Sequence, residues 1–261
     1  MTDLLEKILA VKKREVAAAK NFQPAEILLE SLEATTQDFK AALRTERTNL
    51  PKIIAEIKRR SPSKPQLKPA LQVAELAKIY DEQAAAISVL TDREFFGGSL
   101  EDLSLAEEVS KLPLLRKDFI FDEYQILEAR LMGASAVLLI TRILQLSELR
   151  NLIARAREFK MEPLVEVTNE AEIERALQAG AEIIGINNRD LGTLKIEPQR
   201  TLTLSKKVPA EKIIVAESGF ESPAEVKNLQ GVVDAVLIGT AILQAPDPTT
   251  FLAELTGSFG T

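Results

Sequence analysis

Charged side chains interrupt the short apolar segments of this sequence in a pattern that could support acid–base chemistry. In the segment KIIAEIK, Glu56 and Lys58 lie two residues apart near the end of an apolar run. Residues two apart on a β-strand point to the same face, so this carboxylate and this ammonium should lie side by side. An ammonium can stabilise developing negative charge and a carboxylate can accept a proton. The pair is therefore a candidate catalytic feature.

The chain contains neither histidine nor cysteine, which narrows the chemistry it can perform. Ser-His-Asp triads, cysteine nucleophiles, disulfides and metal sites built on imidazole or thiolate are excluded. If the protein is an enzyme, its proton transfers must fall mainly to lysine, glutamate, aspartate or tyrosine.

Composition places the chain among ordinary globular proteins, with 46% hydrophobic and 28% charged residues in 261. The formal net charge of −6 argues against nucleic acid as a main partner. No apolar run is long enough for a transmembrane helix, and the amphipathic start of the chain is unlike a signal peptide, so we expect a cytoplasmic protein without a membrane partner. The segment from Lys52 to Lys68 is strongly basic and suggests a small anionic ligand. No obligate protein partner is evident.

Short apolar runs alternate with helical patterns along most of the chain. Six segments have the three- and four-residue apolar spacing of helices, and they span residues 71–83, 99–110, 123–133, 146–160, 169–180 and 222–230. Helix starts are expected at Asn169 and Ser222 and helix ends at Gly133 and Gly180. Strands that are apolar on both faces and separated by helices are typical of parallel sheets. Eight such runs are present, and they span residues 52–58, 85–92, 113–119, 135–142, 162–168, 182–190, 212–219 and 234–240.

This alternation predicts one α/β domain over residues 1–261, a (β/α)₈ or TIM barrel. Residues 1–48 precede the first strand, and we expect two or three extra helices there that cap the barrel. A doubly wound open sheet is the alternative, but it would leave eight strands without a recognisable switch point.

Polar side chains gather at the ends of the predicted strands. In such barrels the carboxyl ends of all strands surround one opening, where active sites lie. The alternative interpretation is that these residues form a purely structural network of ion pairs. For a single residue such as Asp118, neither the catalytic nor the structural interpretation is favoured. The charged and amide residues at these ends are Glu56, Lys58, Lys117, Asp118, Glu166, Asn187, Arg189 and Glu217.

Two glycines suggest a phosphate site at the same opening. Gly219 and Gly239 follow the seventh and eighth strands, the usual phosphate position in these barrels. Either glycine alone could be a turn residue. Together they favour a phosphorylated small-molecule substrate.

Seven ordered motifs are similar to those of the indole-3-glycerol phosphate synthase family. They are IIAEIKRRSPSK, SVLTDREFFGGS, LRKDFIFDEYQI, LVEV, IGINNRDL, VAESG and LIGTAI. The resemblance implies a (β/α)₈ barrel lyase of tryptophan biosynthesis without metal or organic cofactor. Its reaction converts 1-(2-carboxyphenylamino)-1-deoxyribulose 5-phosphate to indole-3-glycerol phosphate, with loss of carbon dioxide and water.

The resemblance also implies roles for individual residues. Lys117 resembles the general acid, Glu166 the base or charge partner in the dehydration, and Lys58 a possible second acid. The implied catalytic residues are Glu56, Lys58, Lys117, Glu166, Asn187 and Glu217. The implied substrate-binding residues are Ser61, Phe96, Phe119, Arg189, Ser218, Gly219, Gly239 and Thr240, with the two phenylalanines as walls around the anthranilate ring and Arg189 near its carboxylate.

Two further expectations follow. A lysine at its reference pKa of about 10.4 is a poor acid, so we expect nearby cations and partial burial to lower the pKa of the catalytic lysine. Pro65 departs from the family's glycine and should stiffen the loop after the first strand.

Three alternative functions remain open. They are phosphoribosylanthranilate isomerase, whose usual cysteine base is absent here, a Schiff-base aldolase, and a barrel that binds sugar phosphates without turnover.

Overall fold

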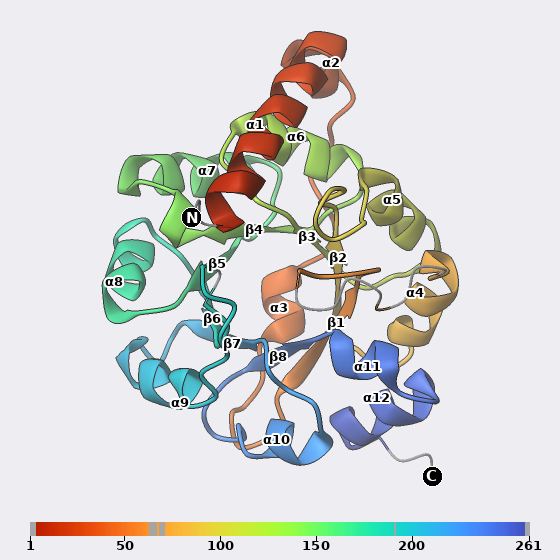
Figure 1. The fold of residues 1–261 in the computed structure, drawn as a ribbon, viewed down its shortest axis with the longest axis vertical. Helices are drawn as coiled ribbons and strands as arrows, with labels where there is room; N and C mark the ends of the chain where they lie inside the picture. The colour runs from red at the N-terminus through yellow and green to blue at the C-terminus, as the bar shows by residue number, and fades with distance from the viewer. Residues whose placement is uncertain (1–3, 63–66, 68–70, 191, 259–261) are drawn as a thin grey trace.

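Eight parallel strands close into a barrel in the computed structural model, which describes residues 4–62, 67, 71–190 and 192–258 (Figure 1). β1 pairs with both β2 and β8, so the sheet has no free edge among these strands. The predicted barrel is confirmed and the open-sheet alternative is wrong. The strands are β1 (Lys52–Ile57), β2 (Ala86–Leu90), β3 (Leu114–Lys117), β4 (Ala136–Ile140), β5 (Leu164–Val167), β6 (Ile183–Asn187), β7 (Ile213–Glu217) and β8 (Ala235–Ile238).

Helices surround the barrel, and the six that the sequence predicts are present. They are α4 (Val73–Asp81), α5 (Leu100–Val109), α6 (Glu123–Leu131), α7 (Leu146–Glu158), α8 (Glu170–Gln178) and α10 (Pro223–Lys227). The sequence patterns did not indicate the others, most of which are too short to show an apolar period. These are α9 (Arg200–Leu204), α11 (Thr240–Gln244), α12 (Pro248–Thr256) and the 3₁₀-helices η1 (Thr141–Ile143) and η2 (Ser205–Lys207).

Local side-chain chemistry fixes the ends of these helices. The Asn169 side chain accepts a hydrogen bond from the Glu172 amide at 3.0 Å and begins α8. Ser222 forms a capping box with Glu225 at the start of α10. Gly133 and Gly180 follow α6 and α8 with φ angles of 91° and 90°, which end the helices as predicted.

Alternation along the strands separates an outer from an inner layer. In β1, Ile53, Ala55 and Ile57 pack in the cluster that contains the surrounding helices. Ile54 belongs to a second cluster inside the barrel. Glu56 follows Ile54 by two residues and therefore also points inward.

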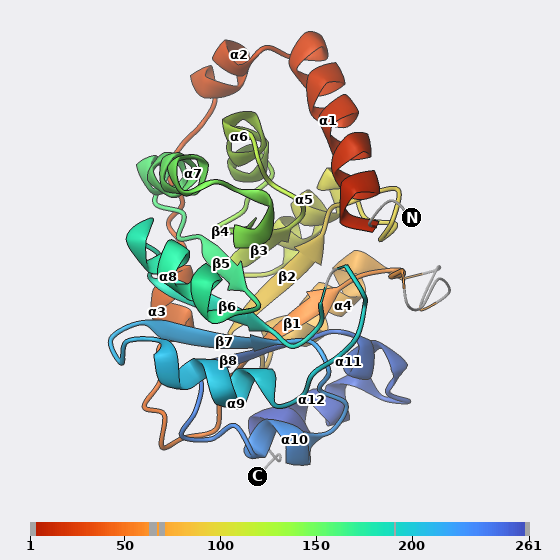
Figure 2. The same ribbon diagram turned by 60° about the vertical axis from the view of Figure 1, so that its left-hand side comes forward.

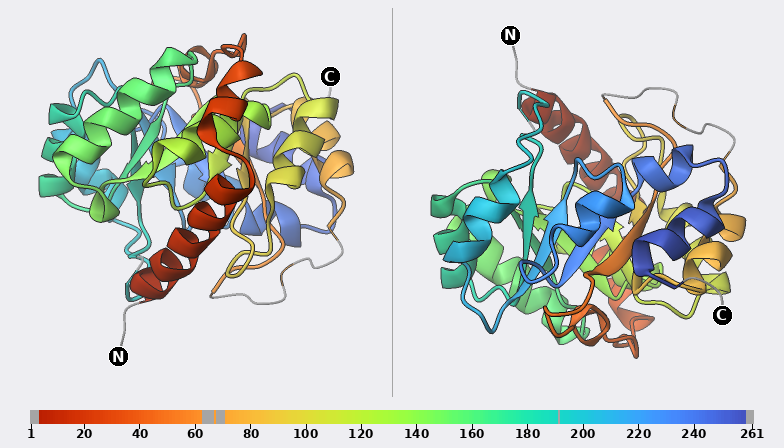
Figure 3. Two further views of the ribbon diagram at one scale, coloured as in Figure 1. Left: turned by 90° about the horizontal axis from the view of Figure 1, so that it is seen from above. Right: turned by 90° about the horizontal axis from the view of Figure 1, so that it is seen from below.

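Three helices precede β1, and two of them cover opposite ends of the barrel. These are α1 (Leu4–Phe22), α2 (Ala25–Glu30) and α3 (Phe39–Leu43). Phe39 and Leu43 of α3 are buried in the interior cluster, so α3 closes the amino-terminal end. Figures 2 and 3 show α1 at the other end, where the strands terminate. The described part of residues 1–48, where capping helices are expected, thus contains α1, α2 and α3.

Replacing the core residue of α3 should weaken the whole barrel. Leu43 is 0% exposed, so Leu43→Ala should lower the free energy of unfolding by about 2–5 kcal/mol. Leu29→Ala in α2 is the matched control, because Leu29 is 41% exposed and its loss should cost less than about 0.5 kcal/mol. Urea unfolding curves measure both changes. Equal effects of the two substitutions would contradict the assignment of α3 as the helix that closes the amino-terminal end of the barrel.

Candidate active site

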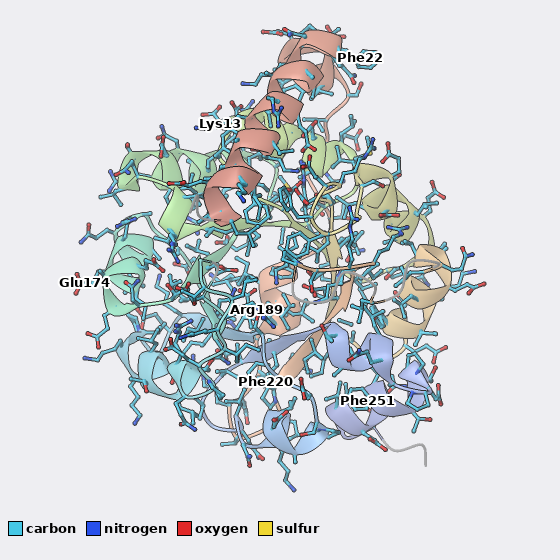
Figure 4. The ribbon with its side chains drawn as sticks, viewed as in Figure 1. Lys13, Phe22, Glu174, Arg189, Phe220 and Phe251 are labelled. Carbon is cyan, nitrogen blue, oxygen red and sulfur yellow. The ribbon has the colours of Figure 1, made fainter. Side chains whose placement is uncertain are left out.

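A cavity of ≈ 170 Å³ opens at the carboxyl ends of the strands. Among the fourteen residues predicted for the site, Glu217 alone is not in its lining, and Glu217 instead contacts Lys117. Figure 4 shows Arg189 toward the centre of the barrel and Glu174 at its periphery. The predicted residues that line the cavity are Glu56, Lys58, Ser61, Phe96, Lys117, Phe119, Glu166, Asn187, Arg189, Ser218, Gly219, Gly239 and Thr240.

A chain of ion pairs crosses the floor of this cavity. Lys58 Nζ lies 2.5 Å from Glu56 Oε1, and Lys117 Nζ lies 3.3 Å from Glu56 Oε2. Lys117 Nζ also donates a hydrogen bond to Glu217 Oε2 at 2.9 Å. Glu56 and Glu217 are buried, so the two ammonium groups supply the positive charge that burial of these carboxylates requires.

The pKa of Lys117 is raised, which corrects the expectation that it would be lowered. Burial acts to lower the pKa of this lysine, but attraction to Glu217, Glu56 and Glu166 outweighs burial. The expectation was wrong because the neighbours of Lys117 are carboxylates. Lys117 is therefore protonated at neutral pH in the ligand-free protein.

The carboxylates of the site differ in protonation. Burial and the nearby Glu217 raise the pKa of Glu166 to about 8, against the attraction of Lys117. Burial also disfavours ionisation of Glu56, but Lys58 and Lys117 lower the pKa of Glu56 to about 2. Within the described residues, Glu166 Oε1 and Glu217 Oε1 are buried and have no hydrogen-bond partner. One carboxylate is thus fully ionised and another titrates near neutral pH, the separation that acid–base catalysis requires.

Two glycines make room for this cluster. A Cβ atom on Gly185 of β6 would lie 2.2 Å from Glu217 Oε1, and one on Gly239 would lie 2.6 Å from Glu56 Oε1. Gly239 therefore accommodates the Glu56 carboxylate, in addition to any role near a phosphate. The sequence analysis missed Gly185, although a glycine inside an apolar strand does signal a close approach.

The turn after β7 is held in a conformation that non-glycine residues rarely adopt. Ser218 and Gly219 have φ angles of 67° and 88°. The Asn188 side chain donates a hydrogen bond to the Ser218 carbonyl at 3.1 Å and accepts one from Thr201 Oγ1 at 2.8 Å. This clamp fixes the orientation of the Gly219 amide beside the cavity.

Aromatic and aliphatic side chains form the opposite wall. The rings of Phe96 and Phe119 have their centroids 6.2 Å apart. Leu5 and Ile8 of α1 line the same cavity. The sequence analysis expected α1 to cap the barrel but did not identify its residues as part of the site, because their apolar spacing looks like that of any packed helix.

Two arginines of the basic segment after β1 bind other residues of the protein. Arg59 forms an ion pair with Asp102 of α5, which raises the pKa of the guanidinium. Arg60 donates to the Arg93 and Glu94 carbonyls at 3.1 and 2.7 Å. Thus Lys58 lines the cavity, whereas these two arginines position the loop. Lys64, Pro65 and Lys68 of this segment lie outside the described residues.

Other partners of the site are local. Asn187 Oδ1 accepts a hydrogen bond from the Arg189 amide at 2.9 Å, and the Arg189 guanidinium donates to the Leu194 carbonyl at 3.1 Å.

In the part of the chain that the structure describes, no group of three or more acidic side chains could hold a metal ion. None of the described helices is both long and apolar enough to cross a membrane.

A closed (β/α)₈ barrel with ammonium and carboxylate groups around one cavity at its carboxyl ends is the arrangement of a barrel enzyme. Solved structures agree with the fold. The 3-hexulose-6-phosphate synthase of Salmonella typhimurium superposes with a TM-score of 0.63 at 16% identity, over 79% of this chain and 97% of that one. A second 3-hexulose-6-phosphate synthase superposes with a TM-score of 0.64 over 80% of this chain.

The sequence profile of indole-3-glycerol phosphate synthase matches residues 5–255. The indole-3-glycerol phosphate synthase of Polaromonas sp. (strain JS666) is 45% identical over 98% of this chain and 99% of its own length. That of Dechloromonas aromatica is 44% identical with the same coverage. The chain belongs to the indole-3-glycerol phosphate synthase family, which confirms the predicted family and its enzyme class, a carboxy-lyase of tryptophan biosynthesis.

The raised pKa of Glu166 should make stability depend on pH. Glu166 has a pKa of about 8 in the folded protein and about 4.3 in an unfolded chain. Between these values the folded state holds a proton that the unfolded state has lost, so the free energy of unfolding should fall as pH rises. Glu166→Gln should remove this contribution, and urea unfolding at pH 5, 6, 7 and 8 measures it.

The matched control for this prediction is Glu174→Gln, an exposed residue of α8. This variant should retain the wild-type pH dependence. Identical pH slopes for wild type and Glu166→Gln would contradict the assignment of a raised pKa to Glu166.

Proposed function

We propose that the cavity converts 1-(2-carboxyphenylamino)-1-deoxyribulose 5-phosphate to indole-3-glycerol phosphate, carbon dioxide and water, with residues 1–261 acting as one barrel domain in the cytoplasm. The observation that carries this proposal is the Lys117 ammonium, which lies 2.9 Å from Glu217 and 3.3 Å from Glu56 beside the cavity. The reaction turns a ketone oxygen into a hydroxyl, and a fixed cation there would stabilise the developing charge.

In the first half of the reaction, the ring carbon that bears the carboxylate attacks the ketone carbon. Lys117 would donate a hydrogen bond and then a proton to the ketone oxygen, which becomes a hydroxyl. The adjacent Glu56 and Glu217 lower the acidity of Lys117, so its main contribution would be electrostatic. Loss of carbon dioxide then restores the aromatic ring and needs no base.

The second half removes the new hydroxyl and a proton from the neighbouring carbon. Glu166, with a pKa of about 8, is suited to exchange a proton near neutral pH. Lys58, 2.5 Å from Glu56, would assist departure of the hydroxyl as a second acid. Asn187 is buried beside them and would orient the substrate.

The remaining residues would hold the two ends of the substrate. Ser218, Gly219, Gly239, Thr240 and Ser61 surround one side of the cavity and would receive the phosphate. Arg189, on the loop after β6, would pair with the anthranilate carboxylate. Phe96 and Phe119 would enclose the aromatic ring between the two halves of the site.

Fluorescence tests the overall proposal. The chain has no tryptophan, so indole emission should rise from a low background when the carboxyphenylamino substrate is added. Binding without any rise would favour a non-catalytic barrel. Borohydride treatment with the substrate present should trap no imine on the protein, and a trapped adduct would favour the Schiff-base aldolase instead. Turnover of phosphoribosylanthranilate would favour the isomerase.

Loss of the Lys117 ammonium should abolish most of the activity. Lys117→Met keeps the length of the side chain but removes the charge that the transition state needs, so kcat should fall by roughly 10²- to 10³-fold. Lys111→Met, at an exposed position just before β3, is the control and should retain wild-type kcat. The rate of increase of indole emission measures kcat for both variants, and urea unfolding curves verify that they are folded. A Lys117→Met enzyme with near-wild-type kcat would remove Lys117 from the mechanism.

A further inference from the structure

A second cluster of buried charges lies outside the barrel wall, between α1 and the ends of β2 and β3. Its cation is Lys12 of α1, which is only 4% exposed. Lys12 Nζ lies 3.1 Å from Asp92 Oδ2 and 3.0 Å from Asp118 Oδ1, and it also pairs with Glu15 at 2.7 Å. Asp118 also lines the active-site cavity and Asp92 does not, and neither belongs to the set of residues proposed to contact the substrate. The cluster therefore needs an explanation of its own.

Each of the two aspartates fixes the backbone of one phenylalanine of the aromatic wall. Asp92 Oδ1 accepts hydrogen bonds from the Phe95 and Phe96 amides at 2.8 and 3.2 Å. Asp118 Oδ1 accepts one from the Phe119 amide at 2.8 Å. One ammonium thus joins the two carboxylates that hold Phe96 and Phe119, which lie in the loops after β2 and β3.

The two aspartates depend on Lys12 to different degrees. Asp118 Oδ2 also pairs with Arg116 at 3.1 Å and accepts a hydrogen bond from Thr91 at 2.7 Å. For Asp92, which is 0% exposed, Lys12 is the only cationic partner within 4.0 Å among the described residues. Without Lys12 the Asp92 carboxylate would be a buried charge with no counter-ion, and we expect its loop to move toward water.

Lys12 is held in its charged form by this arrangement. Burial acts to lower the pKa of Lys12, but the attraction of Asp118 and Asp92 outweighs burial and raises it. Lys12 therefore keeps its positive charge at neutral pH despite its burial.

We propose that Lys12 is a positioning residue that sets the separation of Phe96 and Phe119, and so determines how tightly the site holds the aromatic half of its substrate. The inference rests on the proposed function, because it takes these two rings as the wall for the anthranilate group. Lys12 acts through Asp92 and Asp118 and does not line the active-site cavity itself.

Binding measurements on two ligands test this role. The first is the substrate with its ketone reduced to the alcohol, which contains the aromatic ring but cannot undergo ring closure. The second is glycerol 3-phosphate, which contains only the phosphate end. In Lys12→Met the Kd of the aromatic ligand should rise roughly 2- to 10-fold, the loss expected when one aromatic contact is weakened. The Kd of glycerol 3-phosphate should remain unchanged, because its cradle lies after β7 and β8.

Two further variants separate positioning from simple loss of helix docking. Lys20→Met removes another ion pair between α1 and the barrel, the 2.7 Å contact with Asp122, and should leave both Kd values unchanged. In Lys12→Met/Asp92→Asn the unpaired carboxylate is gone, while the amide oxygen that the second substitution introduces can still accept from the Phe95 and Phe96 amides. This double variant should recover most of the affinity for the aromatic ligand.

The outcomes are distinct. Wild-type affinity of Lys12→Met for the aromatic ligand would overturn the inference, as would equal weakening of both ligands. A double variant as weak as Lys12→Met would also overturn it, because the defect would then come from the helix and not from the carboxylate. If the wild-type protein itself fails to bind the aromatic ligand, the proposed function fails instead.

Discussion

The site depends on one electrostatic constraint, the burial of the Lys117 ammonium among carboxylates inside the barrel. Lys117 Nζ lies 2.9 Å from Glu217 and 3.3 Å from Glu56, and all three side chains are buried or nearly so. Buried charges are tolerated only when they are paired, so each member of this group requires the others. The close packing of these side chains in turn explains why positions 185 and 239 are glycine, since a Cβ there would collide with Glu217 or Glu56.

A closed parallel barrel meets this constraint through its geometry. The side chains of each strand alternate between the helical layer and the interior, so a single charge two residues after an interior isoleucine or leucine is delivered to the mouth. Glu56 follows Ile54 in β1, and Lys117 follows Leu115 in β3. Both strands pair with β2. Glu56 and Lys117, which are far apart in the chain, thereby come into contact without any special loop.

The sequence was sufficient for those features that depend on local patterns. The apolar runs located every strand, and Asn169 and Ser222 located helix starts, because each signal lies within a few residues. The charge partners of Lys117 could not be read in this way. Whether a buried lysine faces cations or carboxylates depends on the closure of the barrel, and the wrong pKa direction followed from that gap. Likewise, alternation places Asp118 on the opposite face from Lys117, but it did not show that Asp118 pairs with Lys12 of α1.

Strand β3 carries charge on both faces, and this links the amino-terminal helix to the chemistry. Lys117 points into the barrel, whereas Arg116 and Asp118 pair with each other on its outer face at 3.1 Å. The outer pair is completed by Lys12, which belongs to a helix outside the eightfold repeat. A strand with ions on both faces can be held in place only if both sets are neutralised together. α1 therefore contributes to the site in two ways, through the apolar contacts of Leu5 and Ile8 and through a counter-charge that the barrel itself does not provide.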